Sequence, residues 1–179
     1  MRIPAMGVVL LLAIVPGTGA AWAKPSVSDL REQLKTAQGD DRMGVIRALG
    51  ESHSGQAVQP LLEIFDVPHI GLPEARYIAM ALGELGDARA VPYLSNAWIF
   101  LKSSGLEDRS MPVEVVARSQ LARRAIVDAL SKIGGDGVID ILVEAARGDS
   151  DFLLVEHACQ ALRRLKPKAM AGLNCPNPS

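Results

Sequence analysis

Aromatic side chains and histidines are scarce in this sequence, and they form no recognisable catalytic pattern. Phenylalanine, tryptophan and tyrosine together make up 4% of the 179 residues, and the histidines are His53, His69 and His157. None of them stands in an H-x-x-x-H or H-E-x-x-H arrangement, which a zinc site on one helix requires. A glycine-rich phosphate loop and a G-x-S-x-G nucleophile motif are also missing. We therefore predict a protein that is not an enzyme, with no catalytic or metal-binding residues and no cofactor.

The sequence also lacks an excess of either charge. Its 19 basic and 20 acidic residues give a formal net charge of −1 at neutral pH. Binding to nucleic acid needs a basic footprint, so we expect no nucleic-acid partner. Basic residues do gather at Arg118, Arg123 and Arg124, and again between Arg163 and Lys168. We expect both groups to be solvated, with an acidic partner as the alternative.

Long apolar runs are absent except at the N-terminus. Arg2 precedes an apolar run over residues 5–15, and small residues follow up to Ala23. This is the layout of a secretory signal peptide, and the run is too short to cross a bilayer core of roughly 30 Å as a helix. We therefore predict a signal peptide over residues 1–23, cleaved after Ala23, and a mature domain over residues 24–179. That domain is expected to be periplasmic or secreted, without membrane insertion, and a retained N-terminal anchor is the alternative.

Alanine, leucine, valine and isoleucine dominate the rest of the chain, a composition that favours closely packed helices over a sandwich or barrel. A short pattern built on an Ala-Leu pair recurs after 33, 48 and 32 residues. Its four copies begin at Ile46, Ala79, Val127 and Cys159. Self-similarity at such periods is typical of stacked helical repeats, in which each unit buries its apolar face against its neighbours.

Each copy predicts a helix with one apolar stripe and one small residue. In the second copy Ile78, Leu82 and Leu85 have the i, i+4, i+7 spacing of residues on one side of a helix. The alanine of each Ala-Leu pair lies beside this stripe, where a small residue lets two helix axes approach to roughly 8–10 Å. These repeat alanines are Ala48, Ala81, Ala129 and Ala161.

Turn residues follow each of these first helices, and a second helix follows each turn. Gly86-Asp87 is typical, because glycine accepts the left-handed conformation that ends a helix and aspartate caps the next one. The equivalent turns are predicted at Ser54-Gly55 and at Gly134-Gly135. The sequence therefore predicts an all-α fold, an α-α superhelix of about four helix-turn-helix repeats.

The string from Ala81 to Leu94, ALGELGDARAVPYL, resembles the short HEAT-like repeat of phycobilin lyases and of many bacterial scaffold proteins. The resemblance covers roughly residues 41–173, in three good copies and one partial copy. Together with the predicted signal peptide and the lack of a catalytic set, it predicts an exported bacterial solenoid that acts as a non-catalytic scaffold for protein-protein interaction. A ligand-handling or lyase-like role, and a structural role in an envelope complex, are the alternatives that it leaves open.

The second helices carry the residues that we predict to bind a partner. After the core positions are removed, the remaining residues of one face are Arg89, Tyr93, Asn96 and Phe100, flanked by Glu63 and Asp140 from the neighbouring units. Exposed aromatic and arginine side chains are typical of interaction hot spots. We expect this face to be concave and to bind another protein or peptide. The alternative is that Tyr93 and Phe100 pack against an insertion at residues 102–114, which is itself either part of the binding face or a tolerated loop.

The two cysteines that the sequence contains are Cys159, in the last copy of the repeat, and Cys175, in the tail. In an oxidising compartment an even number of cysteines favours a disulfide. Such a bond would tie the tail to the last full helix, and two free thiols are the alternative.

Overall fold

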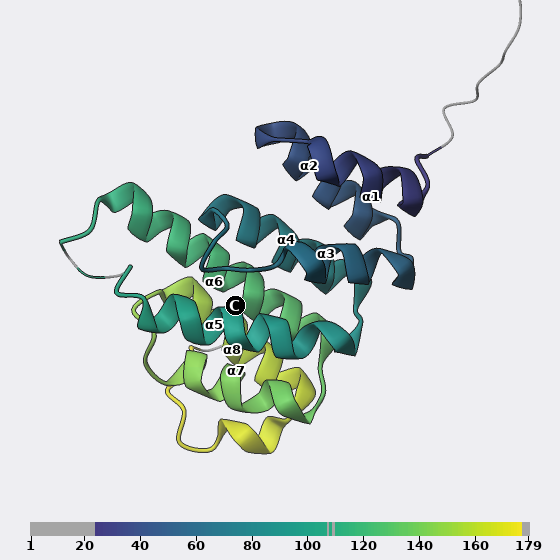
Figure 1. Cartoon of the computed structure of the whole chain (residues 1–179). Coiled ribbons are helices and arrows are strands. Elements are labelled where there is room, and N and C mark those ends of the chain that lie inside the picture. The colour runs from purple at the N-terminus through teal and green to yellow at the C-terminus, as the bar shows by residue number, and fades with distance from the viewer. Residues whose placement is uncertain (1–23, 107, 109, 177–179) are drawn as a thin grey trace, which may run out of the picture.

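A computed structural model describes residues 24–106, 108 and 110–176, and the predicted signal peptide lies outside them. This part of the chain contains α-helices and no strands (Figure 1). The α-helices are α1 (Val27–Thr36), α2 (Gly39–Glu51), α3 (Val58–Ile64), α4 (Leu72–Leu85), α5 (Val91–Ser103), α6 (Val113–Ile133), α7 (Asp136–Gly148) and α8 (Phe152–Leu165). Three short 3-10 helices are η1 (Gly55–Ala57), η2 (Ala88–Ala90) and η3 (Pro167–Met170). The predicted all-α fold is confirmed.

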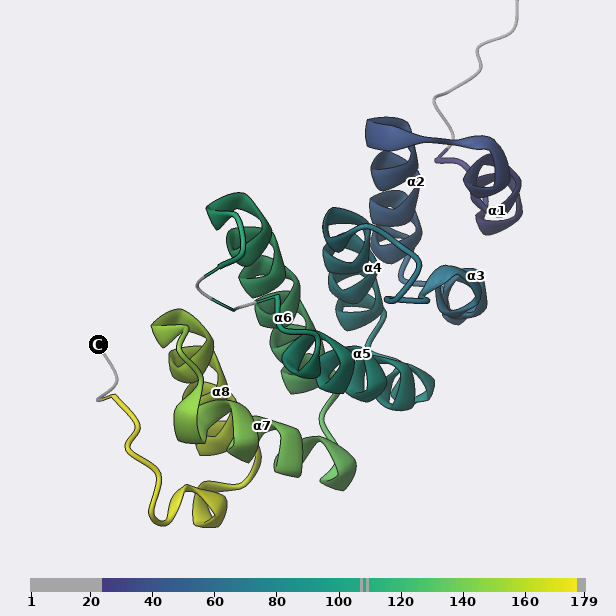
Figure 2. The ribbon, with the colours of Figure 1, turned by 60° about the vertical axis from the view of Figure 1, so that its left-hand side comes forward.

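The helices form two curved layers (Figure 2). The first helices α2, α4, α6 and α8 make one layer, in which each helix packs extensively on the next, and α1, α3, α5 and α7 make the other. Contacts between successive second helices are much sparser. In a curved stack the more closely spaced layer lies on the inner side. The first helices therefore form the concave face, and the expectation that the second helices form it is wrong.

Glycine produces the close spacing of the first helices. A Cβ atom added to Gly50 would lie 2.8 Å from the Cα of Ala81, and one added to Gly83 would lie 2.8 Å from the Cα of Ala129. At these two crossings the repeat alanine of one helix packs against a glycine of the preceding helix. That glycine stands two residues after the repeat alanine of its own helix. The alanine column is buried in the last three repeats and half-buried in the first, as predicted for small residues at helix crossings.

The hydrophobic core fills the space between the two layers. Within the predicted stripe, Ile78 and Leu82 are fully buried and Leu85 is half-buried. The largest fully buried apolar side chains are Trp98, Ile46, Leu49, Leu61, Ile78, Leu82, Leu94, Leu101, Ile126, Leu130 and Leu142. Full burial of such a side chain contributes about 1.5–3 kcal/mol, so the stack is held together mainly by this leucine and isoleucine core.

The turns after the first helices follow the sequence prediction in the second and third repeats and depart from it in the first. Gly86 and Gly134 have φ angles of 65° and 73°. In the first turn the residue with positive φ is His53, at 49°, whereas Gly55 begins η1. A histidine therefore holds the left-handed conformation that glycine holds in the other two turns.

Replacing His53 with glycine is expected to stabilise the protein by about 0.5–1 kcal/mol. Glycine carries no steric penalty at positive φ, and this relief of about 1–2 kcal/mol exceeds the extra chain entropy that glycine loses on folding. Urea unfolding followed by circular dichroism measures the change. His69→Gly, at an exposed position with negative φ, should not stabilise, and a loss of stability in His53→Gly would mean that contacts of the imidazole outweigh the backbone strain.

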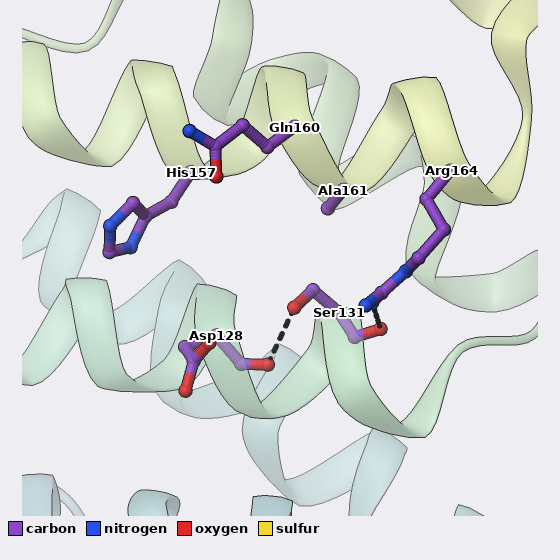
Figure 3. A pocket seen from close by; sticks show the side chains of 6 residues that line it. All are labelled: Asp128, Ser131, His157, Gln160, Ala161 and Arg164. Atoms are coloured by element: carbon purple, nitrogen blue, oxygen red, sulfur yellow. Dashed lines mark hydrogen bonds between the residues drawn. The ribbon is translucent and has the colours of Figure 1, made fainter. Parts of the chain in front are cut away.

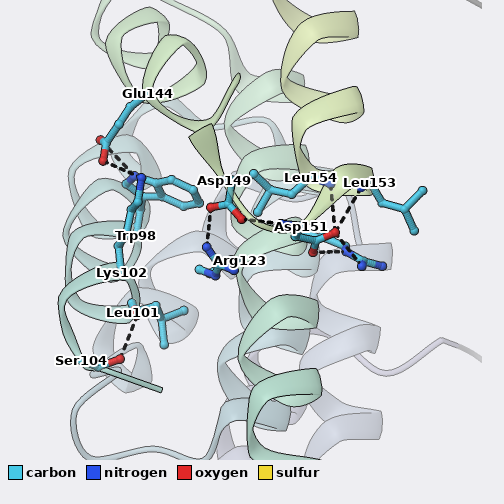
Figure 4. A network of polar contacts seen from close by, with 11 residues as sticks. Trp98, Leu101, Lys102, Ser104, Arg123, Glu144, Asp149, Asp151, Leu153 and Leu154 are labelled. Carbon is cyan, nitrogen blue, oxygen red and sulfur yellow. Dashed lines mark hydrogen bonds and ion pairs between the residues drawn. The ribbon is translucent and has the colours of Figure 1, made fainter. Parts of the chain in front are cut away.

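A buried ion pair ties α6 to the loop between α7 and α8 (Figure 4). Arg123 is fully buried, and its Nη1 lies 2.5 Å from Oδ2 of Asp149. Its guanidinium carbon lies 5.9 Å from the ring centroid of Trp98, whose Nε1 donates to Glu144 at 3.3 Å. The expectation that the basic group around Arg123 is solvated is therefore wrong for this residue.

The same loop begins α8. Asp151 Oδ1 accepts hydrogen bonds from the backbone N–H groups of Leu153 and Leu154, at 3.1 and 3.3 Å. Its Oδ2 accepts one from Nε of Arg124 at 2.5 Å. The N–H of Asp151 in turn donates to Asp149 at 2.9 Å. One short loop thus caps a helix and neutralises two arginines of α6.

The structure joins Cys159 and Cys175 in a disulfide, with 5.8 Å between their Cα atoms. Cys159 is fully buried in α8, and η3 packs on α8 and α7 before the tail returns to the bond. Arg163 donates to the carbonyl oxygen of Pro176. These contacts close the C-terminal end of the stack.

Replacing Cys175 with serine is expected to lower the free energy of unfolding by about 3 kcal/mol, because the bond closes a loop with a sequence separation of 16 in the unfolded chain. Thermal unfolding with and without a thiol reductant measures the effect. The reductant should destabilise the wild type to the level of the variant and leave the variant unchanged. Equal melting temperatures of the oxidised wild type and the variant would contradict a stabilising bond.

Candidate partner-binding surfaces

The predicted partner-binding residues all belong to the second-helix layer, on the outer side of the curve. Tyr93 and Asn96 are exposed on α5, with Tyr93 at 45% of its full exposure, and Phe100 is half-buried. Ile99 is also exposed on this helix, at 59%. The outer side of α5 thus presents an exposed tyrosine and an exposed isoleucine, with an asparagine between them. We call Tyr93, Asn96 and Ile99 the α5 surface.

Arg89 lies in η2, just before α5, and is held by contacts within the protein. Its Nε lies 3.0 Å from Oδ1 of Asp87, and its Nη2 donates to the carbonyl oxygen of Gly55 at 3.1 Å. The hydrogen bond from Arg89 lowers the pKa of Asp87, and the same bond raises the pKa of Arg89. Arg89 therefore links the turns of two successive repeats, a role that its position in the sequence did not reveal.

The two flanking acidic residues lie on either side of α5. Glu63 of α3 accepts hydrogen bonds from Arg31 at 3.2 Å and from Gln59 at 3.4 Å. Asp140 is exposed on α7. The structure thus brings the six predicted residues to one layer but engages Arg89 and Glu63 within the protein, which leaves Tyr93, Asn96 and Asp140 as the most accessible of them.

Among the described residues of the insertion over residues 102–114, Leu106 anchors this segment to the core. Leu106 is half-buried against the hydrophobic core, and so is Phe100 of α5. Val113, at the start of α6, is 73% exposed. Phe100 therefore packs against the hydrophobic core, whereas Tyr93 projects into solvent, so the alternative that both pack against the insertion is wrong for Tyr93.

The concave face carries exposed apolar side chains that our reading of the sequence missed. Met80 of α4, Leu121 of α6 and Leu153 of α8 are exposed at 42%, 37% and 45%. Leu121 and Leu153 occupy one repeat position, eight residues before the repeat alanine, and Met80 lies one residue before it. At 100° per residue these positions fall opposite the core stripe. The repeat register therefore contained the signal for this face.

Two grooves lie between neighbouring first helices on the concave face. The first lies between α2 and α4, has a volume of about 340 Å³, and is lined by Arg47, Gly50, Glu51, His53, Tyr77, Met80, Ala81 and Glu84. The second lies between α6 and α8, has a volume of about 190 Å³, and is lined by Asp128, Ser131, His157, Gln160, Ala161 and Arg164 (Figure 3). We call them the α2–α4 groove and the α6–α8 groove.

The histidines are separated in space as they are in the sequence. His53 lies in the turn after α2, His157 lies on α8, and the ring of His69 contacts Asp66 at 2.7 Å in the loop before α4. Across the described ranges, no three side chains of histidine, cysteine, aspartate or glutamate are grouped so that they could hold a metal ion. Within the same ranges no helix is long and apolar enough to cross a membrane.

Comparison with known proteins supports the repeat. The family model of the PBS lyase HEAT-like repeat matches residues 75–97, which run from α4 through the turn and η2 into α5 and contain Tyr93 and Asn96. A search of curated proteins returned no match. The matched segment includes the string from Ala81 to Leu94 on which the sequence resemblance rests. Together with the stacked helix pairs of the structure, this match shows that the chain has an all-α helical repeat fold that contains a HEAT-like repeat over residues 75–97.

Proposed function

We propose that this protein is an exported, non-catalytic scaffold that binds another polypeptide. Stacked helical repeats present extended surfaces built from many helices, which suits the binding of a folded or extended polypeptide. The observation that carries the proposal is the α5 surface, where Tyr93 is 45% exposed within the segment that matches the HEAT-like repeat. An exposed tyrosine supplies a large contact area at low entropic cost.

Export is supported by two independent features. The N-terminal pattern up to Ala23 is that of a secretory signal peptide. The bond between Cys159 and Cys175 is of the kind that forms and persists in oxidising compartments. The location that we propose is the periplasm or the exterior of a bacterial cell.

The test of this function is an affinity capture of partners from the envelope fraction of the source organism. Wild-type protein and the double variant Tyr93→Ala, Asn96→Ala are compared, and the affinity for the captured polypeptide is then measured with purified components. We expect the double variant to lose about tenfold or more in affinity, since truncation of a hot-spot aromatic costs more than 1.4 kcal/mol.

Phe152→Ala is the matched control, because it removes an aromatic ring that is 64% exposed at the start of α8, away from α5. It should bind as the wild type does. Equal binding by the wild type and the double variant would overturn the α5 surface as the contact. Recovery of a bound pigment or other small molecule with no polypeptide would overturn the scaffold function in favour of a ligand-handling one.

A further inference from the structure

On the concave face, the crossings between successive first helices differ in the charge of the side chain that spans them. The residue three positions after each repeat alanine points to this face, within about 40° of the position of Met80 on the helix. These residues, which we call the inner row, are Glu51, Glu84, Lys132 and Arg164. The row thus changes from acidic in the first two repeats to basic in the last two.

A basic side chain of the inner row crosses each of the last two crossings. Lys132 of α6 reaches back to α4, where its Nζ lies 2.7 Å from Oε1 of Glu84. Its stem passes over the crossing, because its Cδ would lie 3.6 Å from a Cβ on Gly83. Arg164 of α8 reaches back to α6 and donates to the carbonyl oxygen of Ser131 at 2.6 Å (Figure 3).

The first crossing has no such basic side chain, because Glu84 occupies the position that Lys132 and Arg164 occupy in the next repeats. Glu84 faces a second carboxylate, Glu51, across the groove and bonds in the other direction, to Lys132. The α2–α4 groove accordingly has a volume of about 340 Å³, compared with about 190 Å³ for the α6–α8 groove that Arg164 crosses.

We propose that the α2–α4 groove binds a lysine or arginine side chain of a partner polypeptide, with its charged end near Glu51 and Glu84. The aliphatic stem would lie against Met80 and Tyr77, over the crossing of Gly50 and Ala81, as the stem of Lys132 lies over Gly83. The partner thus supplies the cation that the protein supplies to itself at the two later crossings. This site is separate from the α5 surface and goes beyond the function proposed above.

The carboxylates of the groove, rather than its basic residues, are the groups with which we expect a guest to pair. The hydrogen bond from Lys132 lowers the pKa of Glu84, so this carboxylate is ionised at neutral pH. Arg47 and His53 are the basic residues of the lining, and Arg47 also lines the hollow between α1 and α2 on the other side of its helix. The half-buried ring of Tyr77 has the guanidinium carbon of Arg76 at 5.9 Å from its centroid, which is within cation–π distance.

The apolar walls of the groove indicate what should flank the basic residue. Met80 is 42% exposed, and a guest that covers it removes apolar surface from water. The partner segment that fits is therefore an arginine or lysine with apolar neighbours. A small Gly-Ser host peptide with a central Leu-Arg-Leu reproduces this chemistry, and matched peptides with Leu-Gln-Leu and Leu-Glu-Leu change the charge alone.

The experiment titrates each peptide into the purified protein and follows the backbone amide signals by NMR. We expect the Leu-Arg-Leu peptide to shift the signals of Gly50, Glu51, Met80 and Ala81, and the other two peptides to leave them unchanged. Equal shifts with Leu-Gln-Leu would overturn the charge recognition, and binding of Leu-Glu-Leu would assign the groove to acidic guests through Arg47. Shifts confined to other surfaces would overturn the site.

The variant Glu51→Lys reverses the charge of one of the two carboxylates that line the groove. We expect it to remain folded and to bind the Leu-Arg-Leu peptide with an affinity at least about tenfold lower, because a charge-assisted contact is lost and a repulsive one is gained. Glu114→Lys, an exposed charge reversal at the start of α6, should bind as the wild type does. Unchanged binding in Glu51→Lys would overturn the proposal, whereas the Tyr93→Ala, Asn96→Ala variant reports on the α5 surface independently.

Discussion

Replacing Asp149 with alanine is expected to lower the free energy of unfolding by about 3–5 kcal/mol, because it removes the carboxylate that faces a buried guanidinium. Asp149 and Arg123 are each at most 1% exposed, and 2.5 Å separates their paired atoms. The same substitution removes the acceptor of the Asp151 N–H and thereby loosens the start of α8. Urea unfolding, followed by circular dichroism, measures the loss.

Two further variants separate charge from hydrogen bonding. Asp149→Asn keeps an oxygen that can accept from the backbone but removes the negative charge, and we expect it to retain most of the destabilisation. Asp128→Ala removes a carboxylate that pairs with Lys132 at 3.0 Å on the surface, where both side chains are at least 40% exposed, and should cost less than about 1 kcal/mol. If Asp149→Ala lost no more free energy of unfolding than Asp128→Ala, the buried pair of Asp149 and Arg123 would contribute no more to stability than an exposed pair.

The elements of the fold are predictable from the sequence because their signals are local. Pro112 and the apolar pattern up to Ile133 predict one long helix, and α6 runs over Val113–Ile133. Ser26 and Asp29 predict a capping box, and both of its hydrogen bonds are present at the start of α1. Each of these features depends on residues within a few positions of one another, so neither needs knowledge of the stack.

Burial of charge is not predictable in this way. Arg123 and Arg124 are adjacent in the sequence, yet Arg123 is fully buried and the side chain of Arg124 is 27% exposed. The difference arises because Asp149, 26 residues further on, is delivered by the packing of α7 and α8 on α6. The residues near Arg123 in the sequence do not indicate that partner, and the local pattern therefore predicts a solvated side chain.

The candidate surfaces also combine features that the local sequence predicts with features that depend on the packing of distant segments. Exposure of Tyr93 follows from its place on the helix face opposite the core, and the structure agrees with it. The capture of Arg89 by Gly55 depends on how two turns meet, and a sequence does not encode that directly. The curvature decides which layer is concave, and it depends on distances between backbones at Gly50 and Gly83 rather than on the polarity of any side chain.

The double variant Gly50→Val, Gly83→Val is expected to lose about 2–6 kcal/mol of stability, as the sum of about 1–3 kcal/mol of overpacking at each of two crossings. The added Cβ atoms would lie 2.8 Å from the Cα atoms of Ala81 and Ala129, and these are backbone atoms that cannot rotate away. Only a separation of the helices relieves the clash. The gain of a few tenths of a kcal/mol in helix propensity does not offset it.

Gly44→Val is the matched control, because Gly44 also lies inside α2 but a Cβ there would meet no atom within 4 Å. It should be neutral or slightly stabilising by urea unfolding, which separates the crossing from helix propensity. A typical domain has only about 5–15 kcal/mol of stability, and in a repeat stack each interface contributes separately. The double variant should therefore unfold over a broader urea range as α2 detaches before the later repeats. A single sharp transition at the wild-type midpoint would show that the first helices tolerate a wider spacing, and that the glycines do not set the curvature of the concave face.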